Sequence, residues 1–156
     1  MAVFFRGTFE NRLDKKGRVS VPADFRARLK GQSFDGIVAF PSIRHGSKYR
    51  VLECSGTDRA DQLGASIDAT KVTAGQTDED IQFAIMNSRD LPFDTEGRVV
   101  LPGEQLAHLG PTERVTFVGM GPYFEIWPAE AHAARAAGLL QARLAAADRA
   151  LEGGAS

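Results

Sequence analysis

The spacing of hydrophobic residues predicts a chain of short strands and short helices. Val19 and Val21 alternate with a polar serine, as in a strand that buries one face. Pro22 ends this strand and suits the first turn of a helix, in which Phe25 and Leu29 share one face. Apolar and β-branched runs predict further strands over residues 3–9, 36–41 and 48–54.

The same plan returns eighty positions later. Residues 13–22 and 93–102 are identical at five of ten positions, namely Asp, Gly, Arg, Val and Pro. The second copy predicts strands ending at 91–94 and covering 99–101, 115–118 and 123–127, with a helix over 103–109. Two copies of one supersecondary unit predict a pseudo-symmetric domain.

Helices are predicted between and after the two copies. Two of them cover 57–69 and 77–89, separated by a loop at 70–76. The alanine-rich sequence from Ala129 predicts another. Its sparse leucines could pack on the domain or on a neighbouring subunit, or the helix could be solvated, and residues 153–156 are expected to be disordered. The predicted α+β fold, mainly β with short helices, has a first unit (1–55), linking helices (56–89), a second unit (90–128) and a helical tail (129–156).

Composition is that of an ordinary globular protein. The 156 residues are 43% apolar and 25% charged, which suits one domain. The single Cys54 has no partner for an intramolecular disulfide, and this favours a reducing compartment. No apolar run approaches the roughly 20 residues of a membrane span, and the N-terminus lacks the order of a signal peptide. We therefore expect a cytoplasmic protein without a membrane partner.

The net charge of −1 hides a strong asymmetry. Residues 1–50 contain eleven Lys and Arg against four Asp and Glu, a net charge of +7. The other 106 residues contain eight against sixteen, a net charge of −8. The distribution indicates an anionic partner for the first half. Attraction between the halves, within the fold or between subunits, explains the charges equally well.

A charged turn lies at the centre of each repeat. Asp14 and Arg18 face each other across a turn that Gly17 permits. The second copy repeats these residues as Asp94, Gly97 and Arg98. One interpretation is structural, because a bidentate pair of carboxylate and guanidinium would hold the turn in one shape.

The other interpretation is that the turn presents cations to phosphates or base edges. The first copy favours it, since Lys15 and Lys16 occupy the tip and Arg12 and Arg6 precede it. The second copy has threonine and glutamate at its tip, which would repel a phosphate. We therefore expect an anion to bind the first turn, if it binds either.

Enzymatic chemistry has little support in the sequence. The histidines at 45, 108 and 132 show no metal-ligand spacing. The glycines at 119 and 121 lack the rest of a dinucleotide-binding motif, and no nucleophile motif is present. We expect no metal, no cofactor, no small-molecule substrate and no enzymatic activity.

Short motifs follow one another along both repeats: Phe5-Arg6-Gly7, residues 13–22, Phe25-Arg26, Asp94-x-x-Gly97-Arg98, Leu101-Pro102, and residues 117–119 and 125–127. In this order and separation, they resemble the MraZ family of bacterial transcriptional regulators. The resemblance covers roughly residues 4–130. It implies a duplicated swapped-hairpin β-barrel related to AbrB-type regulators, with two pseudo-symmetric units in one domain.

The resemblance also implies a function. Proteins of this kind form ring-shaped homo-oligomers that display their turns along one face. They bind repeated boxes in double-stranded DNA upstream of the division and cell-wall gene cluster, generally as repressors, which implies association with the nucleoid. By position, Arg18 is the leading DNA contact, supported by Lys15, Lys16 and Arg12. The acidic neighbour of Arg98 leaves the role of the second turn open.

Two other interpretations remain. An AbrB-like antitoxin would neutralise a toxin through a disordered acidic tail, whereas this tail is alanine-rich and mixed in charge. A structural or adaptor ring would bind protein rather than DNA and would use the charge asymmetry for head-to-tail assembly. Binding to duplex DNA distinguishes the adaptor from the regulator.

Overall fold

The computed structural model describes residues 3–68 and 78–154 of the chain. Within them lie eight strands and five helices, in the order β1 (Thr8–Arg12), β2 (Arg18–Ser20), α1 (Ala23–Arg28), β3 (Gly36–Pro41), β4 (Leu52–Ser55), α2 (Thr57–Asp68), α3 (Asp78–Met86), β5 (Arg89–Pro92), β6 (Arg98–Val100), α4 (Gly103–Leu109), β7 (Arg114–Gly119), β8 (Phe124–Pro128) and α5 (Ala129–Gly154).

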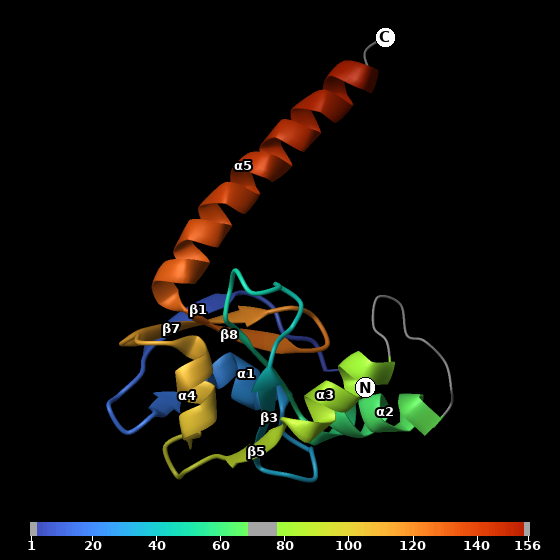
Figure 1. Ribbon diagram of the computed structural model, residues 1–156. Coiled ribbons are helices and arrows are strands. Elements are labelled where there is room, and N and C mark those ends of the chain that lie inside the picture. Colours follow the sequence, from blue (N-terminus) through green and yellow to red (C-terminus); the bar gives the residue numbers. More distant parts are fainter. Residues whose placement is uncertain (1–2, 69–77, 155–156) are drawn as a thin grey trace.

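The described strands form two antiparallel sheets with helices around them (Figure 1). The larger sheet has six strands in the order β1-β7-β8-β4-β3-β5, and the smaller sheet is the ribbon β2-β6. β1 and β5 are the outer strands of the larger sheet, so the described strands form no closed barrel. The predicted mixture of strands, short helices and a C-terminal helix is confirmed.

The two repeats exchange strands. β1 pairs with β7, and β5 pairs with β3, so the outer strand of each repeat lies against the other repeat. The motif strands β2 and β6 pair with each other. The order of the larger sheet is unchanged when β1–β4 and β5–β8 are swapped. The motif strand and the outer strand of each repeat therefore have their partners in the other repeat.

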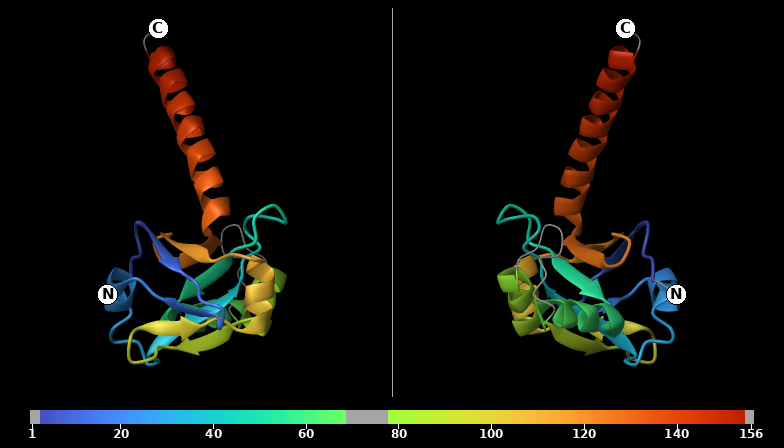
Figure 2. Two further views of the ribbon diagram at one scale, coloured as in Figure 1. Left: turned by 90° about the vertical axis from the view of Figure 1, so that its left-hand side faces the viewer. Right: turned by 90° about the vertical axis from the view of Figure 1, so that its right-hand side faces the viewer.

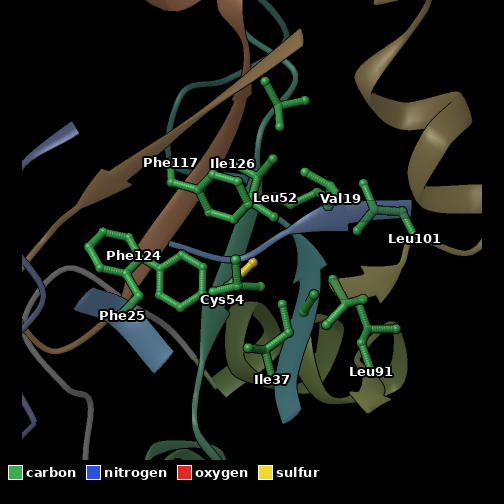
Figure 3. Close-up of a cluster of buried hydrophobic side chains, with 14 of the residues drawn as sticks. Val19, Phe25, Ile37, Leu52, Cys54, Leu91, Leu101, Phe117, Phe124 and Ile126 are labelled. Carbon is green, nitrogen blue, oxygen red and sulfur yellow. The ribbon is translucent and has the colours of Figure 1, made fainter. Parts of the chain in front are cut away.

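Alternation directs one side of the motif strands into the core. Val19 and Val99 are each 1% exposed, and they are the middle residues of β2 and β6. Phe25 of α1 packs on Phe124 of β8, with ring centroids 4.9 Å apart. Figure 3 shows side chains from both repeats meeting in one cluster. Burial of each large apolar side chain stabilises the fold by about 1.5–3 kcal/mol.

The strand predicted over 3–9 is wrong in its first half. β1 begins at Thr8, because Gly7 has a φ of +87° and interrupts the extended backbone. Before it, Phe5 makes only an isolated bridge to Gly121. The aromatic run therefore marks a buried anchor followed by a bend, and hydrophobicity alone does not separate these from one strand.

Other predicted boundaries shift by a few residues. The strand predicted over 48–54 begins at Leu52, after a turn, whereas residues 36–41 form β3 as predicted. The predicted loop at 70–76 and the first residue of the second linking helix lie outside the described residues. The described part of that helix, α3, begins at Asp78 with three acids in its first turn.

Helix α5 projects from the rest of the chain, as Figure 2 shows from two sides. Near its start, His132 packs on Trp127 of β8 with ring centroids 5.6 Å apart. No residue of this helix is buried. It continues through Gly153, which the sequence predicts to be disordered. Among the described helices, none has the length and apolar character needed to cross a membrane.

Two buried carboxylates face each other across the centre of the larger sheet. Glu53 of β4 pairs in register with Glu125 of β8, and each is 1% exposed. Arg44 donates from Nε to Oε1 of Glu53 at 2.7 Å, and Nη2 of Arg59 lies 2.8 Å from Oε2. The indole of Trp127 donates to Glu125 at 3.0 Å. Each carboxylate therefore has partners that offset its loss of water.

Replacing Glu53 with glutamine is expected to lower the free energy of unfolding by about 3 kcal/mol, because two arginines then lose their buried counter-charge. The matched control is Glu10→Gln. Glu10 contacts Arg114 at the same 2.7 Å, but both side chains are about half exposed, so a loss below about 1 kcal/mol is expected. Urea unfolding measures both variants. Equal losses would show that burial does not set the cost.

Candidate nucleic-acid interface

The side chain of Asp14 organises the first turn, residues 14–18. Its Oδ1 accepts hydrogen bonds from the backbone N–H groups of Lys16 and Arg18, at 2.9 and 2.8 Å. Its Oδ2 accepts from Nε of Arg18 at 2.7 Å. The guanidinium therefore contacts the carboxylate through Nε and not as the expected bidentate pair, because Oδ1 is taken by the backbone. One carboxylate fixes both the backbone of the turn and the start of the guanidinium.

The second turn, residues 94–98, has the same geometry. Asp94 Oδ1 accepts from the N–H groups of Glu96 and Arg98, at 2.9 Å each, and Oδ2 accepts from Nε of Arg98 at 2.8 Å. The glycines have similar left-handed conformations, with φ of +84° at Gly17 and +78° at Gly97. Any difference in what the turns bind must therefore come from their other side chains.

Each turn is bonded to the strand of the other repeat. The carbonyl of Gly17 accepts from the N–H of Leu101 at 2.8 Å, and the carbonyl of Gly97 accepts from the N–H of Val21 at 3.2 Å. A Cβ on Gly17 would lie 2.9 Å from the carbonyl oxygen of Leu101. Because β2 and β6 are antiparallel, the turns lie at opposite ends of one short ribbon.

The outer face of this ribbon carries the motif arginine of each repeat, Arg18 and Arg98. Side chains alternate along a strand, so the face opposite Val19 holds Arg18, Ser20, Arg98 and Val100. The Arg18 and Arg98 side chains are 38% and 32% exposed, and Val100 is 54% exposed. The ribbon therefore presents two guanidinium groups on a face that is open to a partner.

The two turns differ in the charge of the side chains at their tips. The side chain of Glu96 folds back toward Arg98 and places Oε2 2.6 Å from Nη2, so the Arg98 guanidinium lies between the carboxylates of Asp94 and Glu96. At the first turn the equivalent position is Lys16, which is exposed beside the exposed Lys15. Within the described residues, Arg18 forms its ion pair with Asp14 alone. The first turn keeps hydrogen-bond donors that the second uses internally.

Four of the predicted cationic residues meet at one shallow hollow of about 310 Å³ beside the first turn. They are Arg12, Lys15, Lys16 and Arg18. Glu113 also lines the hollow, because the carbonyl of Glu113 bonds to the chain just before the turn. Its acidic side chain was not expected there, since one hundred residues separate it from Leu13.

Two other arginines lie apart from this hollow. Arg6 is exposed and lies before β1, whereas the turn follows the other end of that strand. Arg26 of α1 packs against the second turn: Nε donates to the carbonyl of Val21 at 3.1 Å, and a Cβ on Gly97 would lie 2.5 Å from Nη1. Sequence reasoning missed this contact. The available signal was that the matching position in the repeat holds Leu106.

The described residues contain no group of three or more His, Cys, Asp or Glu side chains that could hold a metal ion. Cys54 is a fully buried core residue, and this burial raises the pKa of its thiol well above the ordinary value. A larger open groove of about 970 Å³ lies beside α3 and α4, and no residue of either turn lines it. The cationic hollow at the first turn is therefore the site that matches the sequence motif.

A family model described as "MraZ protein, putative antitoxin-like" matches residues 4–40 and 84–152, which include both turns. The chain belongs to the MraZ family. Proteins named "Transcriptional regulator MraZ" from Rickettsia bellii, Pelagibacter ubique and Rhodospirillum rubrum are 39%, 38% and 42% identical to it over 127, 123 and 125 residues. These alignments cover 81%, 79% and 79% of this chain and 82%, 77% and 78% of the relatives.

The turns of this MraZ-family chain depend on ionised carboxylates. The backbone N–H of Arg18 is the largest cause that lowers the pKa of Asp14, and the N–H of Arg98 does the same for Asp94. In turn, the hydrogen bond to Asp94 raises the pKa of the Arg98 guanidinium. Protonation of either aspartate removes hydrogen-bond acceptors from its turn, so low pH weakens the turns of both repeats.

Acid is expected to destabilise the fold partly through these two aspartates. Their pKa values are lower in the folded chain than in the unfolded one, so their stabilisation is complete above the ordinary Asp pKa of about 4. It is lost as the pH falls through the folded pKa values. Between about pH 5 and pH 2, the Tm of the double variant Asp14→Asn, Asp94→Asn should therefore fall less than the Tm of the wild type. Circular dichroism melts test this, and parallel pH profiles would contradict it.

The substitution Gly17→Ala is expected to cost about 2 kcal/mol of unfolding free energy, because it combines a left-handed φ with a clash against Leu101. Gly31→Ala is the control. Its φ is +90°, but no atom lies within 4 Å of the added Cβ, so about 1 kcal/mol is expected from the backbone alone. Chemical unfolding measures the difference. A smaller loss at Gly17 than at Gly31 would show that the turn has room beside the other repeat.

Proposed function

We propose that this MraZ-family chain is a DNA-binding transcriptional regulator that contacts double-stranded DNA through its first turn and the outer face of the β2–β6 ribbon. The observation that carries the proposal is the hollow at which Arg12, Lys15, Lys16 and Arg18 meet. Three cations on a turn with a fixed backbone, with Arg12 at the end of the adjoining strand, suit a polyanion. The name shared by the relatives supports the regulatory role.

The ribbon and the turn would divide the work of recognition. A two-stranded ribbon fits the major groove of B-DNA, where arginine donates to O6 and N7 of guanine. Arg18 keeps its Nη groups for a base edge or a phosphate, since Asp14 holds Nε. The exposed Lys15 and Lys16 suit phosphates, whose contacts position a protein and weaken as salt rises.

The second turn would hold the ribbon in its conformation and would add little to the affinity for DNA. Glu96 and Asp94 already occupy the guanidinium of Arg98, and two carboxylates around one guanidinium leave a net negative charge that repels phosphate. The second turn still holds the far end of the ribbon in place through its bond to Val21. In this proposal the duplication supplies a rigid platform, and the first repeat supplies the cations.

Assembly would convert weak contacts into useful affinity. We extend the proposal to a ring-shaped homo-oligomer that aligns first turns with repeated boxes upstream of the division and cell-wall gene cluster, acting as a repressor at the nucleoid. Several linked contacts raise the effective concentration of each further one. The exchanged strand order supports a duplicated swapped-hairpin organisation, with units at 1–55 and 90–128, linking helices at 56–89 and a tail at 129–156.

The decisive experiment is fluorescence anisotropy with duplex DNA from upstream of the chain's own gene and a shuffled duplex as control. Titrations at several salt concentrations give the slope of log affinity against log salt concentration, from which the number of phosphate contacts follows. Preferential binding with a steep slope supports the regulator. Absence of binding to either duplex would overturn it and favour an adaptor ring that binds protein.

Arg18→Ala is expected to weaken operator binding about tenfold or more, whereas Arg98→Ala should change it by less than about threefold. Arg98→Ala breaks two ion pairs and Arg18→Ala breaks one, so a purely structural role predicts the opposite order. Anisotropy titrations measure affinity, and melting curves monitor the fold. Arg149→Ala on α5 controls for the loss of one positive charge. Equal losses for Arg18 and Arg98 would show that both turns contact DNA.

A further inference from the structure

Helix α5 continues far beyond the part that touches the sheet. Its 26 residues span about 39 Å at 1.5 Å per residue. The start of the helix packs near β8, and the remainder projects away from the body (Figures 1 and 2). No side chain of the helix is buried. Helices in proteins gain most of their stability by packing an apolar face, so the projecting part lacks the usual support.

One face of α5 carries a heptad pattern. Apolar residues recur at alternating spacings of four and three along the helix, at Ala133, Ala137, Leu140, Leu144, Ala147 and Leu151. The three leucines are 58%, 51% and 74% exposed. An apolar seam that repeats every 3.5 residues is the contact face of a left-handed coiled coil. The three small alanines of this seam allow two helices to approach closely.

Two charged residues beside this seam have no partner on their own helix. Ion pairs within a helix form three or four residues apart. Arg143 has no acid at these spacings, and Asp148 has no base. They are five residues apart. With the seam at heptad positions a and d, Arg143 is at g and Asp148 is at the following e.

This spacing selects a partner and an orientation. In a parallel two-stranded coiled coil, a g residue of one helix meets the following e residue of the other. Two copies of α5 in register therefore form two pairs between Arg143 and Asp148. The antiparallel register that keeps the whole seam in contact is centred on Ala142, and it sets Arg143 of one copy against Arg143 of the other. Charge therefore opposes the antiparallel arrangement.

We propose that α5 binds the α5 of a second copy of this chain as a parallel, in-register, two-stranded coiled coil. The seam from Ala133 to Leu151 supplies the contact, and Arg143 and Asp148 set the direction. Parallel pairing suits neighbouring subunits whose helices leave the same face of an assembly. The pairing depends only on α5 and does not rest on the proposed binding of DNA.

Disulfide trapping in the full chain tests the pairing. A disulfide needs Cα atoms about 4.4–6.8 Å apart, which in a parallel coil occurs between equal seam positions. Ala137→Cys should therefore give a covalent dimer on mild oxidation. Ala142→Cys is the matched control, since it lies on the outer side of the helix and should remain mostly monomeric on non-reducing gels. The native Cys54 is fully buried and does not interfere.

A mixture of Ala137→Cys and Ala147→Cys chains tests for the antiparallel orientation. Positions 137 and 147 face each other only in the antiparallel register, so a disulfide between the two kinds of chain would report that orientation. Cross-linking confined to the mixed pair, or equal cross-linking at positions 137 and 142, would overturn the proposal. So would an absence of cross-linking at position 137. The turns are untouched in all these variants, so operator binding remains a separate measurement.

Charge reversal tests the role of the flanking pair. In the Ala137→Cys background, Arg143→Glu should slow cross-linking about fivefold, because two attractions become repulsions. Adding Asp148→Arg should restore the rate by reversing both charges. Circular dichroism checks that helix content is unchanged. An unchanged rate in the single variant, or no recovery in the double variant, would overturn the assignment of Arg143 and Asp148.

Discussion

The reciprocal hydrogen bonds between the turn glycines and the opposite motif strands hold the architecture together. Gly17 accepts from Leu101, and Gly97 accepts from Val21, so each repeat closes the ribbon of the other. The close approach of the backbones leaves no room for a Cβ at Gly17. The burial of Val19, the position of both turns and the exposed face of arginines all follow from this exchange.

Duplication gave this MraZ-family chain two turns with one backbone geometry and different electrostatics. Asp14 and Asp94 make the same hydrogen bonds, which shows that the Asp-Arg pair is a structural unit in both repeats. The side chains at the tips are free to differ, because they do not support the turn. Lys16 extends the cationic surface of the first turn, whereas Glu96 adds a second carboxylate beside Arg98 and leaves the second turn net negative.

The features that could be predicted from the sequence are those set by residues close together in the chain. Local patterns predicted the turns, the alternation around Val19 and the short helix α4, because those features depend on residues a few positions apart. The buried pair of Glu53 and Glu125 could not be predicted in this way, since acids are mostly exposed. The contact of Arg26 with the second turn was also missed, because strand exchange creates it.

The sequence by itself determined the repeat, the shape of each turn and the excess of cations at the first one. These depend on local backbone preferences and on the covalent order of charges. Only the tertiary structure decided that the two turns share one ribbon, that Glu113 joins Arg12 and Lys16 at the hollow, and that α5 leaves the body. Such neighbours come from pairing between β1 and β7 or β2 and β6, and the free energy of these contacts depends on residues about a hundred positions apart.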